Sequence, residues 1–119
     1  MKTVKITTDN VISIVDVDFD NYRSIQKEIG CDLFEIVKTG KMLRYFIDPV
    51  VMLVDEEGIC KKLPVNMIGC RFYDTAQHGS PIVGDIVFGV QRWEDIVPPE
   101  DAEKMKQQLL KDFPFLKEA

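Results

Sequence analysis

The run from Val50 to Val54 most constrains the fold, because five consecutive apolar residues between turn signals indicate a strand buried in a sheet. Residues 55–58, DEEG, follow this run and predict a tight turn. The next segment, ICKKL at residues 59–63, is predicted to return antiparallel to the first strand. We therefore expect the chain to be organised around a sheet with antiparallel neighbours.

The N-terminal third predicts a β-hairpin followed by a helix. Residues 2–8 and 11–17 are rich in β-branched side chains, and Asp9–Asn10 between them can adopt positive φ at a turn. In the stretch that follows, Asp20 can serve as the helix N-cap and Gly30 can end the helix. The residues at helical spacing that form its apolar side are Tyr22, Ile25 and Ile29.

Two more strands and two helical segments complete the prediction. DLFEIVKTG (32–40) alternates in the manner of a strand, and PIVGDIVFGV (81–90) predicts another, in which Gly84 marks a bulge or a close backbone approach. KMLRYFI (41–47) fits either a helical turn or a short strand. PVNMIGCRFYD (64–74) is compatible with one helical turn that starts with Pro64.

The clearest helix is predicted at residues 99–113. Pro99 suits its first position, and Pro114 ends it. Its apolar side consists of Ala102, Met105, Leu109 and Phe113. With no repeat or linker in the sequence, we expect residues 1–119 to form a single α+β domain, a small and largely antiparallel sheet with helices packed on one face.

Composition and charge limit the classes of partner. The chain has 20 acidic and 15 basic residues and a formal net charge of −5, which argues against direct binding to nucleic acid or an anionic membrane. The N-terminal MKTVKITTDN has no apolar signal core, and no apolar run approaches the roughly 18 residues of a membrane span. We expect a cytoplasmic protein without membrane contact.

The sequence predicts no metal site and no cofactor. The cysteines are Cys31, Cys60 and Cys70. They lack the CxxC spacing of zinc sites, and the chain has a single histidine, so free thiols are expected. The alternating aspartates from Asp16 to Asp20 resemble the start of a calcium loop. However, such a loop needs glycine at its sixth position and glutamate at its twelfth, where this chain has Asn21 and Lys27.

His78 is the only histidine, and it lies in a predicted loop. Asp74 or Asp85 could orient it as a general base, with Ser80 as the nucleophile. However, HGSPIVG contains no GxSxG elbow, and Ser80 precedes a proline, which favours extended backbone. The alternatives are a loop histidine satisfied by backbone or solvent, a ligand or partner contact, and catalysis. The first of these is favoured.

Arg92 and Trp93 stand together at the end of a predicted strand, and exposed Arg and Trp are enriched at binding hot spots. Alternatively, Trp93 covers the sheet end against the last helix. Asn66 and Arg71 are either turn residues or polar groups that line a cleft. The candidate binding residues are Asn66, Arg71, Tyr73, His78, Asp85, Arg92 and Trp93. No catalytic residue is predicted.

Three motifs in this order resemble a bacterial and phage family, the domain of unknown function DUF3846. They are VDEEG (54–58), KLPVN (62–66) and IVGDIVFG (82–89), within a resemblance that covers about residues 11–90. The tail from Gln91 goes beyond the expected core. The resemblance implies a small protein of phages and conjugative elements, with an accessory or counter-defence role, and it transfers no catalytic residue.

We carry three functional hypotheses. The first is a non-enzymatic binding module that holds a protein partner or a small-molecule ligand. The second is a sponge for a small nucleotide, which needs aromatic stacking and basic groups. The residues available for it are Arg71, Phe72, Tyr73 and Arg92. The third is a small enzyme that uses His78. A homo-oligomer is compatible with each, because a small open sheet leaves edges that a second copy could pair with.

Overall fold

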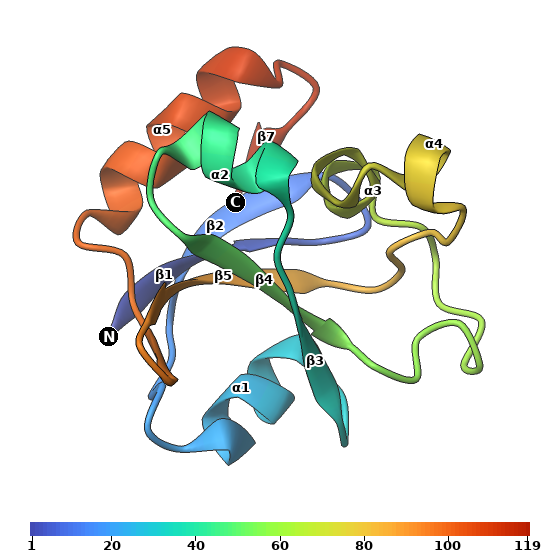
Figure 1. The fold of residues 1–119 in the computed structure, drawn as a ribbon, viewed down its shortest axis with the longest axis horizontal. Helices are drawn as coiled ribbons and strands as arrows, with labels where there is room; N and C mark the ends of the chain where they lie inside the picture. Colours follow the sequence, from blue (N-terminus) through green and yellow to red (C-terminus); the bar gives the residue numbers. More distant parts are fainter.

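The computed structural model describes all residues from 1 to 119 and contains a single, mostly antiparallel sheet (Figure 1). The strand order is β3-β4-β5-β1-β2-β7, and β6 pairs with β5. Only the contact between β2 and β7 is parallel. The strands are β1 (Lys2–Ile6), β2 (Val11–Asp16), β3 (Phe34–Val37), β4 (Val50–Asp55), β5 (Ile86–Arg92), β6 (Asp95–Val97) and β7 (Lys117–Glu118). The α+β class and the largely antiparallel sheet are confirmed.

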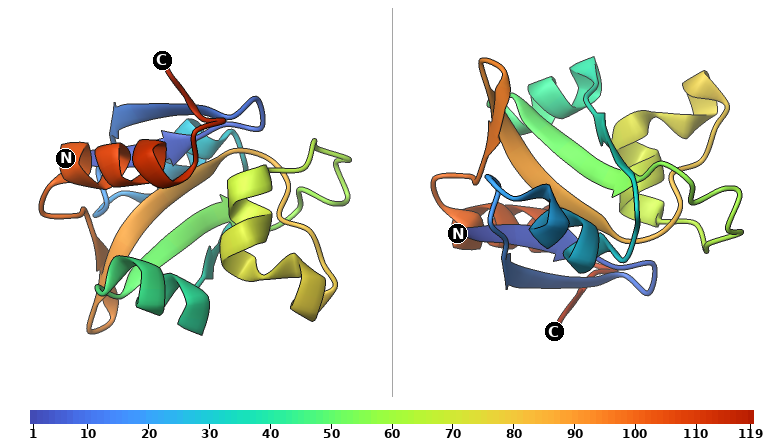
Figure 2. Two further views of the ribbon diagram at one scale, coloured as in Figure 1. Left: turned by 90° about the horizontal axis from the view of Figure 1, so that it is seen from above. Right: turned by 90° about the horizontal axis from the view of Figure 1, so that it is seen from below.

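The helices cover both faces of the sheet, which corrects the expectation that they pack on one face. They are α1 (Tyr22–Ile29), α2 (Gly40–Phe46), α3 (Met67–Tyr73), α4 (Thr75–His78) and α5 (Ala102–Asp112). Figure 2 shows α2, α3 and α5 on one side of the sheet and α1 on the other. No helix is both long enough and apolar enough to cross a membrane.

The continuous apolar run in β4 explains why both faces are covered. Successive side chains of a strand point to opposite faces. Val50 and Met52 therefore join the larger buried cluster beneath α2, α3 and α5, whereas Val51 and Leu53 join a smaller cluster. Ile25 and Ile29 of α1 belong to that smaller cluster. Every residue of β4 is buried, which is possible only when each face of the sheet has its own cover.

The predicted N-terminal elements are present, with one change of cap. β1 and β2 form the hairpin, and Asn10 has the positive φ (63°) expected at its turn. Gly30 ends α1 with a φ of 81°. The N-cap is Asn21 rather than Asp20, because the Asn21 side chain accepts a hydrogen bond from the Arg23 N–H. The Asp20 N–H instead donates to the Asp18 side chain.

Residues 59–63 do not form the predicted return strand. The buried Asp55 carboxylate organises this segment as a series of turns, since its Oδ1 accepts from the Glu57 N–H and its Oδ2 lies 2.8 Å from the Lys61 ammonium. Lys62 has a φ of 58°, which is incompatible with a strand. The antiparallel neighbours of β4 are β3 and β5 instead.

Three other boundaries differ from the sequence prediction. Residues 64–74 contain seven helical residues (α3) rather than one turn, because Asn66 caps the helix. The strand predicted at 81–90 begins only at Ile86. The last helix begins at Ala102 with Asp101 as its N-cap, so Pro99 precedes the helix. The ambiguous segment 41–47 is helical and belongs to α2, whose N-cap is Thr39.

Candidate binding site

The hairpin between β5 and β6 presents Trp93 to solvent. The Trp93 side chain is 95% exposed, which overturns the alternative in which it covers the sheet end against the last helix. Its φ of 57° lies in the left-handed region, which costs a residue with a side chain about 1–2 kcal/mol. The Gln91 amide donates to the Trp93 carbonyl at 3.1 Å. A tryptophan at this position therefore does not stabilise the fold, because its side chain is exposed and its backbone conformation is unfavourable.

The exposure of Trp93 can be checked directly, because it is the chain's only tryptophan. We expect the fluorescence maximum of the folded protein to match that of free tryptophan and to shift little on unfolding in urea. Acrylamide should quench the folded and the unfolded protein almost equally. A blue-shifted, protected emission from the folded protein would contradict the exposed position.

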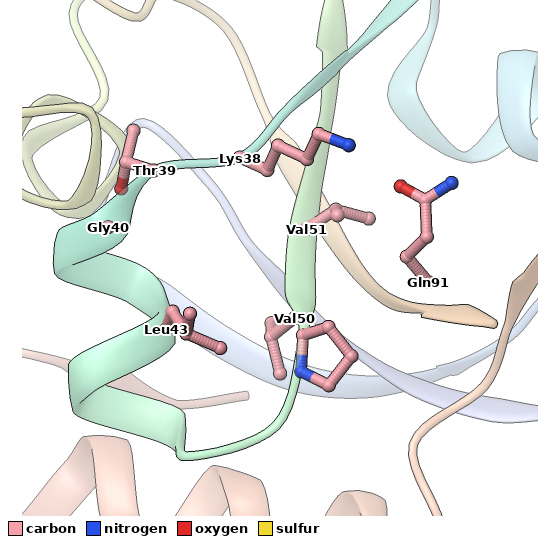
Figure 3. A pocket seen from close by; sticks show the side chains of 8 residues that line it. Lys38, Thr39, Gly40, Leu43, Val50, Val51 and Gln91 are labelled. Carbon is pink, nitrogen blue, oxygen red and sulfur yellow. The ribbon is translucent and has the colours of Figure 1, made fainter. Parts of the chain in front are cut away.

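A pocket of about 330 Å³ lies beside this hairpin, between α2 and the beginning of β4 (Figure 3). Its lining residues are Lys38, Thr39, Gly40, Leu43, Pro49, Val50, Val51 and Gln91. Leu43 and Pro49 are the exposed apolar residues of this lining, whereas the side chains of Val50 and Val51 are almost fully buried. Figure 3 shows the polar ends of Lys38 and Gln91 on the side of β4 to which Val51 points. Gln91 connects the pocket to the hairpin through its hydrogen bond to the Trp93 carbonyl.

Positive charge borders this pocket without acidic partners. Lys38 is the only charged residue of the lining, and like most basic side chains of this protein it forms no ion pair. The Arg44 guanidinium lies close to Gly40. A β-carbon at position 40 would be only 3.3 Å from its Nη1. No carboxylate lines the pocket. The whole chain has a net charge of −5, but the charge at this pocket is positive, so the pocket favours an anion.

Asn66 is fully buried, and its side-chain amide is occupied by the protein itself. Its Nδ2 donates to the Ile6 carbonyl at 3.1 Å and to the Gly84 carbonyl at 3.0 Å. Its Oδ1 accepts from the Gly69 N–H at 3.0 Å. Asn66 thereby joins β1, the segment before β5 and the start of α3, and it faces no pocket as a ligand group.

Arg71, Tyr73, His78 and Asp85 lie near the other end of β5 from the hairpin (Figure 1). The Arg71 guanidinium lies over the Phe113 ring, 5.3 Å from its centre. The rings of Tyr73 and His78 stack with their centres 4.9 Å apart. Asp85 accepts from the Thr8 N–H and lies 3.8 Å from the Lys5 ammonium.

The structure therefore stacks Tyr73 with His78 near one end of β5, whereas Arg92 and Trp93, which are neighbours in sequence, lie at the other end. His78 is the exposed last residue of α4, and no carboxylate or hydroxyl hydrogen-bonds to its ring. Ser80 lines a different surface depression together with Tyr73. The geometry required for a histidine-activated nucleophile is thus not assembled here.

The acidic residues and the thiols are also placed separately. Asp16 hydrogen-bonds to the N-terminal ammonium of Met1, which lowers the pKa of its carboxyl with a smaller contribution from Lys2. Burial raises the pKa of the Cys31 thiol, whereas Cys60 is exposed. No group of three or more His, Cys, Asp or Glu side chains is placed to hold a metal ion.

The fold and this site describe an α+β sheet protein with a protruding, tryptophan-bearing hairpin and an adjacent small pocket. The chain belongs to the family Domain of unknown function (DUF3846), whose family model matches residues 1–110. The match includes β1 and most of α5, so it extends in both directions beyond the expected core of residues 11–90. No curated protein and no solved structure matches the sequence.

Proposed function

We propose that this protein is a non-enzymatic binding module that holds a protein partner through Arg92 and Trp93 at the β5–β6 hairpin. The exposure of Trp93 is the observation that carries the proposal. Burying a tryptophan and an arginine at the centre of an interface typically makes them hot spots. Since Trp93 stands on a protruding tip and small ligands bind in concave sites, a macromolecular surface fits it better than a small molecule.

The nucleotide-sponge alternative has less support from the arrangement of its residues. Phe72, one of its candidate stacking rings, is buried in the core. Arg71 lies over Phe113 in the α3 region, whereas Arg92 lies at the far end of β5. A nucleotide would therefore not meet these aromatic and basic groups together.

We further propose a cytoplasmic accessory or counter-defence role on a phage or conjugative element, in which this module occupies a host or element protein. The support is the resemblance of the three motifs to proteins of such elements. Binding alone can block a partner, so this role needs no catalytic group. The acidic balance of the chain also suits a partner with a basic surface.

The double variant Arg92→Ala/Trp93→Ala tests the proposed interface. The tagged protein is used to capture partners from a lysate of cells in which the chain is naturally made, with quantification by mass spectrometry. We expect the specific partner to be depleted about 30-fold, which corresponds to about 2 kcal/mol for a hot-spot pair. The captured partner is then produced alone, and its affinity for both variants is measured by calorimetry.

A matched control is the variant Tyr22→Ala/Arg23→Ala, which removes another exposed aromatic–arginine pair from α1. This control should capture the partner as the unmodified protein does. Both double variants should unfold in urea within about 0.5 kcal/mol of the unmodified protein. Equal capture by all three proteins would contradict the proposed function.

A further inference from the structure

We propose that the pocket between α2 and β4 binds the apolar C-terminal residue of an extended peptide, with its carboxylate at Lys38. This inference rests on the proposed function, because it specifies which part of a protein partner the module would recognise. Three independent features carry it: the size and lining of the pocket, the unpaired positive charge, and an open strand edge. Each feature corresponds to one chemical group of a peptide C-terminus.

The size and lining of the pocket suit one terminal residue with an apolar side chain. A volume of about 330 Å³ is at the lower limit of ligand pockets, which typically span about 300–1,000 Å³. The backbone at Val50 and Val51, whose side chains are almost fully buried, forms the floor, and Pro49 and the exposed Leu43 form the walls. A branched side chain such as leucine would bury its own apolar surface here and cover that of Leu43.

The charge at the rim suits a carboxylate. Lys38 reaches over Val51 with its ammonium, has no ion-pair partner, and faces no acidic residue in the pocket lining (Figure 3). A charge-assisted hydrogen bond from an ammonium to a carboxylate is about twice as strong as a neutral one. An apolar ligand that ends in an anion therefore matches this pocket better than a neutral one.

The open edge of β4 suits the last N–H of a peptide. β3 ends at Val37, which pairs with Met52, so no strand pairs with Val50 and Val51 on that side. The Gln91 N–H donates to the Pro49 carbonyl, and the Glu56 N–H donates to the Leu33 carbonyl. In an antiparallel ladder this alternation turns the Val50 carbonyl toward the open edge.

A peptide that extends the line of β3 can donate its C-terminal N–H to that carbonyl, as peptides do when they add to a sheet edge. A free apolar acid has the same carboxylate and side chain but no N–H to donate. The strand edge thus favours a peptide end over a free acid as the occupant of the pocket.

The test uses three small probes with the same side chain: N-acetyl-leucine, its carboxamide and 4-methylpentanoate. Each is titrated into the full ¹⁵N-labelled chain, and amide shifts of Gly40, Val51 and Gln91 are followed by NMR. We expect saturable shifts with N-acetyl-leucine. The carboxamide, which lacks the charge, should bind about tenfold more weakly. The 4-methylpentanoate, which lacks the N–H, should bind about fivefold more weakly.

Two variants with matched controls locate the site. Lys38→Met should weaken N-acetyl-leucine binding about tenfold, whereas Lys41→Met has the same net charge and should leave it unchanged. Leu43→Ala should weaken it severalfold, whereas Leu33→Ala, at another exposed leucine, should not. All four variants alter exposed or partly exposed side chains, and an unchanged urea midpoint shows that each is folded.

The outcomes separate this inference from the proposed function. Absent shifts, equal binding of the carboxamide, or a Lys38→Met protein that binds normally would each overturn the pocket proposal. Equal binding of 4-methylpentanoate would assign the pocket to free acids and overturn the peptide assignment. The probes are too small to need the hairpin, so Arg92→Ala/Trp93→Ala should still bind them. Partner capture by that variant tests the proposed function alone, and its result does not depend on the pocket.

Discussion

Replacement of Asn66 with alanine is expected to lower the free energy of unfolding by about 3–4 kcal/mol, since three buried backbone groups lose their partner. The carbonyls of Ile6 and Gly84 and the N–H of Gly69 would remain buried without the amide that they now contact. Urea-induced unfolding followed by circular dichroism measures this loss. The effect is large because one side chain joins three segments that are far apart in the sequence.

Asn21→Ala is the matched control, because Asn21 is also an asparagine N-cap but is exposed. Its loss should cost about 0.5–1 kcal/mol, as is usual for a solvated cap. Asn66→Asp should be as destabilising as Asn66→Ala at neutral pH, since a carboxylate cannot donate to the two carbonyls. Equal losses for Asn21→Ala and Asn66→Ala would refute the structural role assigned to Asn66.

The second large effect is expected for Phe72→Ala, which should cost about 3–5 kcal/mol through the cavity that it leaves. Phe72 is almost fully buried. Its ring centre lies 5.1 Å from that of Tyr45, 5.2 Å from Phe46 and 5.7 Å from Phe113. It also meets Phe88 of β5 edge to face at 6.2 Å. The ring therefore connects α2, α3 and the end of α5 to the sheet.

The control for this variant is Phe115→Ala, which removes a ring that is 41% exposed at the edge of the same aromatic group. It should cost less than about 1 kcal/mol, because solvent already reaches that side chain. Both variants are compared by urea unfolding at the same pH. A small loss for Phe72→Ala would mean that the ring is free to serve a ligand, and it would revive the nucleotide hypothesis.

Local patterns in the sequence were sufficient for the elements whose residues are neighbours along the chain. The β-branched segments on either side of Asn10 predicted the first hairpin, and Gly30 marked the end of α1. The apolar run at Val50 predicted β4. The same run also contains a signal for a second layer, because a strand with five consecutive apolar residues needs cover on both faces. That signal predicts a layer opposite α5, where α1 lies.

Long-range contacts decided the points at which the prediction failed. ICKKL has the composition of a strand, but the Asp55 carboxylate holds the backbone before it in turns. From the sequence, Asn66 is a binding candidate because it is polar and next to a turn. Its amide is occupied by Ile6 and Gly84, which are 60 and 18 residues away in the sequence. Spacing alone cannot reveal such partners.

The candidate site was foreseen only in part. The pair Arg92 and Trp93 was identified from residue type, whereas the exposure of the indole depended on where the hairpin turns. The pocket was missed because its lining comes from three segments, around Lys38, Val50 and Gln91. The segment 41–47 offered one signal: as a helix it exposes Leu43, an apolar side chain that lines the pocket.

The two valines beneath the pocket belong to different interiors of the molecule. Val50 points into the packing shared with α5, and Val51 points into the packing shared with α1. A ligand bound in the pocket would thus contact the β4 backbone that separates the two buried clusters, which are the two halves of the molecule. Its binding energy should raise the melting temperature of both halves together and slow amide exchange on either side of the sheet, so that occupancy can be detected far from the pocket itself.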